Sequence, residues 1–172
     1  MRTLTIDGNL NQKLPDDSSV MKEVDTIFIK NSTDPSLCLL GLYSNLKTLH
    51  FTDCEYICGS WMYLPQKLEQ LHIVRCNLDW TDLHNIVHNR FTNLNSLVLF
   101  GNATLVGEFD MSDFPNLKSL SLTCTNINKM KNWWRVCNLS GLFAIFDTPL
   151  IKNQPYIWTW FKFTRKIKQL FL

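Results

Sequence analysis

The chain of 172 residues lacks several features that would define a function class. No stretch approaches 18 consecutive apolar residues, so we expect no membrane-spanning helix. The first ten residues hold one basic residue and no apolar core, which does not fit a secretory signal. The six prolines and six glycines are scattered, which excludes collagen and low-complexity linkers. A net charge of +2 excludes a strongly basic nucleic-acid binder as a description of the whole chain.

Motifs for catalysis and cofactor binding are also missing. The sequence has no GxSxG, no glycine-rich phosphate loop and no paired-carboxylate motif. His84 and His88 have helical spacing, but Asn85 stands where a zinc protease of the HExxH type has glutamate. We therefore expect no enzymatic activity, no cofactor, no bound metal and no small-molecule substrate.

The six cysteines do not form a metal-binding pattern. No two of them make a CxxC pair, and Cys54 and Cys58 lack a second pair at zinc-finger spacing. Because no secretory signal is expected, the cysteines indicate a reducing compartment, and the predicted location is cytoplasmic or nuclear. Cys54 and Cys76 are interpreted as buried structural thiols, since the sequence places no base or helix start beside them.

What the sequence does contain is a period of 22 to 26 residues. A nine-residue pattern, in which three spaced apolar residues are followed by a small polar residue, occurs seven times. The units begin at residues 1, 24, 46, 68, 94, 117 and 139, and read MRTLTIDGN, VDTIFIKNS, LKTLHFTDC, LEQLHIVRC, LNSLVLFGN, LKSLSLTCT and LSGLFAIFD. A chance alternation of apolar residues would not keep such a step six times, so the period indicates a repeated structural unit.

Each unit is predicted to open with a short strand that cannot bury its apolar side alone. Stacking the next strand beside it, about 4.8 Å away, buries those side chains in a continuous core. The ninth residue is small and can hydrogen-bond backbone groups of the neighbouring unit. These residues are Asn9, Ser32, Cys54, Cys76, Asn102, Thr125 and Asp147. On the far side of the core we expect Tyr43, Phe91 and Phe114, and a helix over 82–88 with Thr81 as its cap.

This pattern resembles the leucine-rich repeat family over about residues 1–150, with a weaker echo at 167–172. The resemblance implies an α/β fold, a right-handed solenoid with short parallel strands on its concave face and irregular or short helical returns on its convex face. Residues 1–172 would then form a single domain of about seven repeats, with a partial repeat or cap at 151–172. The unit at 68–93 looks like the cysteine-containing subtype, which is frequent in F-box-type substrate receptors and ribonuclease-inhibitor-like proteins.

In the family arrangement, the third, fifth and seventh residues of each unit face the concavity. This surface would have few charges and several aromatic residues, which favours a protein-binding groove, although such residues also simply suit strands. The predicted binding residues are Phe28, Lys30, His50, His72, Val74, Val98, Phe100 and Phe143. His50 and His72 are interpreted as a polar pair on neighbouring strands rather than as metal ligands.

Residues 157–172 are both aromatic and basic, and two interpretations are open. The segment could contact nucleic acid or a membrane surface. The favoured alternative is that Trp158, Trp160, Phe161 and Phe163 cover the last open part of the core, because a solenoid needs protected ends. The pair Trp133–Trp134 is interpreted in the same way, as packing on the convex side.

The predicted function is non-catalytic recognition of another protein through the concave face. Within that class, the resemblance implies the substrate-recognition part of an F-box-type ubiquitin-ligase adaptor, with ubiquitin-ligase components as further partners if upstream sequence is missing. The alternatives are a ribonuclease-inhibitor-like enzyme regulator and a fragment of an extracellular leucine-rich-repeat receptor. We expect no nucleic-acid partner and no membrane span.

Overall fold

The computed structural model describes residues 2–8, 18–33, 37–55, 57, 60–88 and 91–162. Within them, seven strands form one open, parallel sheet in chain order, and two further strands form a second sheet. The main sheet comprises β1 (Arg2–Asp7), β2 (Val24–Lys30), β3 (Thr48–Thr52), β4 (Gln70–Val74), β5 (Ser96–Val98), β7 (Ser119–Ser121) and β9 (Phe143–Ala144). The second sheet pairs β6 (Val106–Asp110) with β8 (Asn126–Lys131). The expectation of an α/β fold with a parallel sheet is confirmed.

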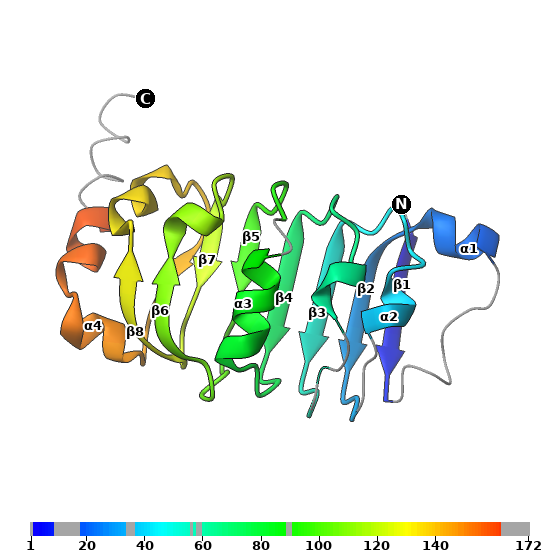
Figure 1. Cartoon of the computed structure of the whole chain (residues 1–172), viewed down its shortest axis with the longest axis horizontal. Coiled ribbons are helices and arrows are strands. Elements are labelled where there is room, and N and C mark those ends of the chain that lie inside the picture. Colours follow the sequence, from blue (N-terminus) through cyan, green and yellow to red (C-terminus); the bar gives the residue numbers. More distant parts are fainter. Residues whose placement is uncertain are drawn as a thin grey trace.

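Short helices and 3₁₀ turns connect the strands. They are α1 (Ser18–Glu23), α2 (Leu37–Leu40), η2 (Trp61–Tyr63), α3 (Trp80–His88), η3 (Met111–Asp113), η4 (Trp133–Asn138) and α4 (Pro149–Asn153), and residues 156–162 are also helical. Figure 1 shows the strands side by side along the molecule, with α2, α3, β6 and β8 lying in front of the main sheet. Among the described residues, no helix is long and apolar enough to cross a membrane.

Equivalent positions of successive units lie next to each other across the main sheet. Thr26 pairs with Thr48, Thr48 with Gln70, Gln70 with Ser96, and Ser96 with Ser119. This register places the inward side chains in continuous rows. One fully buried row is Ile27, Leu49, Leu71, Leu97 and Leu120, and a second is Ile29, Phe51, Ile73, Leu99 and Leu122. Each such side chain contributes about 1.5–3 kcal/mol by leaving water.

The core is closed on its far side by aromatic and helical residues. Tyr43, Phe91 and Phe114 are buried there, as predicted. The helix expected at 82–88 is α3, but its cap is Asp79 rather than Thr81. The Asp79 Oδ1 accepts from the Asp82 backbone N–H at 2.9 Å, and the Asp82 Oδ2 accepts from the Asp79 N–H at 3.3 Å. This reciprocal pair satisfies two donors at the helix start, which a threonine inside the first turn could not do.

A buried row of small polar residues follows the strands where the chain turns away from the sheet. The row consists of Ser32, Cys54, Cys76, Asn102, Thr125 and Thr148. Just before it, the backbone at Asp53, Arg75 and Gly101 has a positive φ, which bends the chain out of the strand. At Gly101 an added Cβ would lie 2.7 Å from the Arg75 Cγ, so the position favours glycine both by conformation and by space.

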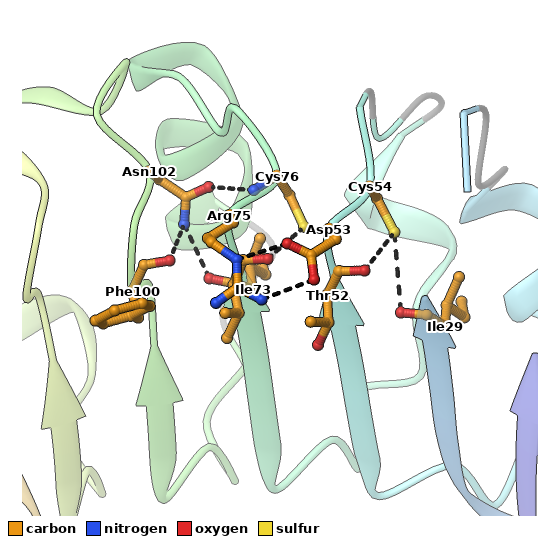
Figure 2. A network of polar contacts seen from close by, with 10 residues as sticks. Ile29, Thr52, Asp53, Cys54, Ile73, Arg75, Cys76, Phe100 and Asn102 are labelled. Atoms are coloured by element: carbon orange, nitrogen blue, oxygen red, sulfur yellow. Dashed lines mark hydrogen bonds and ion pairs between the residues drawn. The ribbon is translucent and has the colours of Figure 1, made fainter. Parts of the chain in front are cut away.

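Asn102 is the most connected member of this row. Its Oδ1 accepts from the backbone N–H groups of Cys76 at 3.0 Å and Leu78 at 3.1 Å, and its Nδ2 donates to the carbonyls of Ile73 and Leu99. Figure 2 shows the side chain reaching from its own turn to the turn before it. Asn102 therefore satisfies buried backbone groups of two successive units at once.

The seventh strand is shifted by one residue from its predicted register. Phe143 pairs with Leu120, a buried inward position, so the unit effectively begins at residue 140 rather than at 139. Phe143 and Ile145 are consequently buried, whereas Leu142 and Phe146 are exposed. The segment GLFAIF has apolar residues in both alternating sets, so alternation alone does not fix its register. Packing decides it, because the Phe143 ring meets the Phe161 ring at a centroid distance of 4.7 Å.

The second sheet was not predicted from the sequence. Phe109 of β6 and Ile127 and Met130 of β8 are buried in the same core as the main sheet. The return segments in this half of the chain are therefore extended and paired with each other. In the N-terminal half, the returns are helical turns instead. A fixed repeat in the main strands is thus compatible with quite different return segments.

Replacing Asn102 by alanine is expected to lower the free energy of unfolding by about 3 kcal/mol, because buried N–H and carbonyl groups lose their partners. Asn116→Ala is the matched control, since this exposed side chain makes one hydrogen bond, to the Thr92 carbonyl. It should cost less than about 1 kcal/mol. Urea unfolding measures both, and equal losses would contradict the role given to Asn102.

The corrected register is tested by two neighbouring phenylalanines. Phe143→Ala is expected to cost about 3–5 kcal/mol, because it empties a buried site, while Phe146→Ala should cost less than about 1 kcal/mol. The measurement is again the free energy of unfolding in urea. A larger loss for Phe146→Ala would restore the register predicted from the sequence.

Candidate binding surface

The main sheet has one face that lies away from α2 and α3, which are in front of its other face (Figure 1). We call this the open face and define it by the third, fifth and seventh residues of each unit. Of the predicted binding residues, Phe28, His50, His72, Val74, Val98 and Phe100 lie here half-buried, and Lys30 lies here exposed. Phe143 does not, because it is 4% exposed and belongs to the core. Its assignment to the concave face was wrong, and the one-residue shift of β9 is the reason.

Aromatic rings follow one another along the middle of the open face. The register aligns Phe28, His50, His72 and Val98 on four adjacent strands. The Phe28 and His50 ring centroids are 4.5 Å apart, and those of His50 and His72 are 4.1 Å apart at an interplanar angle of 66°. The His72 Nε2 lies 2.9 Å from the Ser96 Oγ, on the neighbouring strand. The row is thus a continuous strip of ring surface with polar nitrogen atoms set into it.

Burial keeps the two imidazoles neutral. It lowers the pKa of His50 to about 4, with the neighbouring His72 as a second cause. Burial also lowers the pKa of His72. At neutral pH the middle of the open face therefore carries no formal charge, and each ring can both donate and accept a hydrogen bond.

Polar side chains border this strip on one side, and on the other side a polar pair follows the strand ends. One border is formed by the third-position residues Thr26, Thr48, Gln70, Ser96 and Ser119. Beyond the other border, the Arg75 Nε and Nη2 donate to the Asp53 carboxylate at 2.5 and 2.7 Å, as Figure 2 shows. This hydrogen bond holds the pKa of Asp53 below its usual range. The arrangement is an apolar strip with a polar rim, which is the usual anatomy of a protein interface.

The described residues offer no metal site. No group of three or more His, Cys, Asp or Glu side chains gathers there. His50 and His72 are the pair on adjacent strands that the sequence indicated. Cys54 and Cys76 are buried beneath the strand ends, where the Cys76 Sγ donates to the Val74 carbonyl at 3.1 Å.

Two surface residues at the C-terminal end were missed by the sequence analysis. Leu142 comes directly before β9 and Phe146 follows it, and both side chains are exposed. In the corrected register, Phe146 is the seventh residue of its unit. The signal that could have found them is Thr148, whose Oγ1 donates to the Ile145 carbonyl at 2.9 Å. Thr125 makes the same hydrogen bond to the Leu122 carbonyl one unit earlier. Thr148 is therefore the equivalent of Thr125, and this equivalence gives the correct register of the last unit.

Comparison of the chain with family models, with curated proteins and with solved structures finds no match. The resemblance to leucine-rich repeats therefore stays a prediction, and the case for a function depends on the surface itself.

The buried imidazole of His50 predicts a specific pH dependence of stability. Its pKa is lowered in the folded chain, so its contribution is complete above about pH 6.5 and is lost as the pH falls toward 4. The loss is on the order of 2 kcal/mol. Urea unfolding between pH 7.5 and 4 should show a shallower decline for His50→Gln than for the unchanged chain. Thr52→Val, on the same strand, is the control, and three parallel profiles would contradict the prediction.

Proposed function

We propose that the chain is a leucine-rich-repeat solenoid that recognises another protein through its open face, without catalysis. The observation that carries the proposal is the strip of Phe28, His50, His72 and Val98, which is ordered by strand register and left uncovered by the helices. Ring surface that continues over adjacent strands, rather than single scattered apolar residues, is the kind of patch that marks interaction sites.

The arrangement of the strands supports the solenoid part of the proposal. Six of the seven main strands carry the predicted pattern in register, and each pairs in parallel with the strand of the next unit. The turns after β2, β3, β4, β5, β7 and β9 each have a buried small polar residue, from Ser32 through Asn102 to Thr148. A chain that winds through similar units and shares its core only with neighbouring units accounts for both features.

The chemistry of the open face supports a protein partner. The strip offers flat apolar rings, and Phe100 and Val74 extend it toward the strand ends. Lys30 is the charged member of the predicted set and lies beside the strip rather than within it. Such a surface fits a segment with aromatic or aliphatic side chains and a few hydrogen-bonding groups, better than it fits a phosphate-rich ligand. The narrower role in a ubiquitin-ligase adaptor stays a prediction.

The test compares proteins captured by the unchanged chain with those captured by Phe28→Ala/Phe100→Ala, using quantitative mass spectrometry. Aromatic anchors at the centre of an interface are worth at least about 2 kcal/mol each, so specific partners should be lost or weakened more than tenfold. A partner found in this way is then purified, and its Kd for both chains is measured.

Met62→Ala/Tyr63→Ala is the matched control for this experiment. It also removes two large exposed side chains, but they belong to η2, outside the main sheet. This variant should capture the same proteins as the unchanged chain, with circular dichroism verifying that all three chains fold. If the Phe28/Phe100 variant captures the same proteins in equal amount, the open face is not the binding surface.

A further inference from the structure

Large apolar side chains that remain in solvent gather at the C-terminal end of the described chain. They are Trp134, Leu142, Phe146, Ile151, Tyr156 and Trp160, and each is at least 36% exposed. The sequence analysis expected the aromatic residues here to cover the core. The structure divides them, because Ile157 and Phe161 are buried while Tyr156 and Trp160, from the same helical segment, are not.

The exposed aromatic rings are held together by Trp133. Its ring centroid lies 6.2 Å from that of Trp134, 5.0 Å from that of Tyr156 and 6.2 Å from that of Trp160. Trp133 packs against the core, whereas Trp134, Tyr156 and Trp160 are 53, 46 and 41% exposed. We call these three the end patch. Burial of Ile157 and Phe161 fixes one side of the helical segment, so Tyr156 and Trp160, one turn apart, are presented outward together.

Positive charge is concentrated in the same part of the chain. Residues 126–172 hold eight of the 17 basic residues and one of the 15 acidic residues, so they carry a formal charge of +7 within a chain of net charge +2. Among the described residues, Lys129 and Lys131 form ion pairs with Glu108. Lys162 lies 5.2 Å from the centroid of the Trp158 ring. Arg135 follows Trp134 in η4, and Lys152 belongs to α4, which lies between Trp134 and Tyr156 in the sequence.

We propose that the end patch docks on the surface of an anionic phospholipid bilayer. Tryptophan and tyrosine have apolar rings with one polar atom, which suits the boundary between headgroups and acyl chains. The basic residues of the same stretch of sequence add attraction to anionic lipids. This contact is peripheral and separate from the open face.

The geometry favours a bilayer over single-stranded nucleic acid. Base stacking needs flat ring faces that are free to accept a base. Here the rings of Trp134, Tyr156 and Trp160 each meet the Trp133 ring, at interplanar angles of 77, 62 and 90°, so they do not form a parallel series with Trp133 on which successive bases could stack. The exposed aliphatic side chain of Ile151, in α4, has no stacking role, whereas it adds apolar area for insertion.

The experiment mixes the whole chain with vesicles of phosphatidylcholine, with and without phosphatidylserine. We expect co-sedimentation with the vesicles that contain phosphatidylserine, a blue shift of tryptophan emission, and weaker binding as salt is raised. Lys152→Ala/Lys162→Ala should reduce binding by about fivefold for each charge removed. Equal binding to both kinds of vesicle, unaffected by salt, would overturn the electrostatic part of the proposal.

Trp134→Ala/Trp160→Ala tests the aromatic part, with Trp80→Ala as the matched control. Trp80 is similarly exposed, but it begins α3 and lies outside the end patch. The double variant should lose vesicle binding and the control should keep it. Trp134→Ala alone repeats the test if the double variant unfolds, since this side chain is the most exposed of the three.

Three further results decide against the bilayer. The first is binding of the chain to a single-stranded oligonucleotide but not to vesicles. The second is vesicle binding that persists in a folded Trp134→Ala/Trp160→Ala variant. The third is self-association of the unchanged chain that this variant abolishes. The last result would assign the end patch to a second copy of the chain. Phe28→Ala/Phe100→Ala should leave vesicle binding unchanged, so failure of the open-face proposal and failure of this one are distinguishable.

Discussion

The structure depends on each main strand sharing its buried surface with the strands beside it. A strand such as β4 presents Leu71 and Ile73 inward, which is too little apolar area to fold alone, and the same positions of β3 and β5 complete it. Equivalent residues must therefore lie side by side, and the register follows from this need. The turns at the strand ends depend on their neighbours in the same way, through hydrogen bonds. Asn102 satisfies backbone groups of its own unit and of the unit before it.

The same alternation explains which parts of the fold could be predicted. In β3, β4 and β7 most outward residues are polar, so alternation places these strands and their faces correctly. In β2 and β5, where Phe28 and Val98 face outward, the spacing of the repeat adds the missing information. In β9 the contrast disappears, since Leu142 and Phe146 are as apolar as Phe143 and Ile145. The contact of Phe143 with the segment 156–162 then decides the register, and alternation within one unit contains no information about it.

The two candidate surfaces also differ in how far the sequence predicts them. The members of the open face follow from register, so Phe28, His50, His72 and Val98 were predictable as neighbours. Their state was not, because burial lowers the pKa of both imidazoles only once the rings are stacked in the sheet. The end patch was not predictable either, since Ile157 is buried while Trp160, three residues later in the same helical segment, is exposed.

Because neighbouring strands share the core through their inward residues, most of the stability comes from residues other than those that would bind a partner. Outward residues in the middle of a strand contribute little to the shared core, so they can change without loss of the register that holds the sheet. The neutral strip on the open face and the basic, aromatic end patch use different side chains and different elements. A bilayer contact at the end patch would therefore leave the strip of Phe28, His50, His72 and Val98 free for a protein. Under both proposals the two surfaces could act together, because neither of them consists of the fully buried side chains that neighbouring strands share.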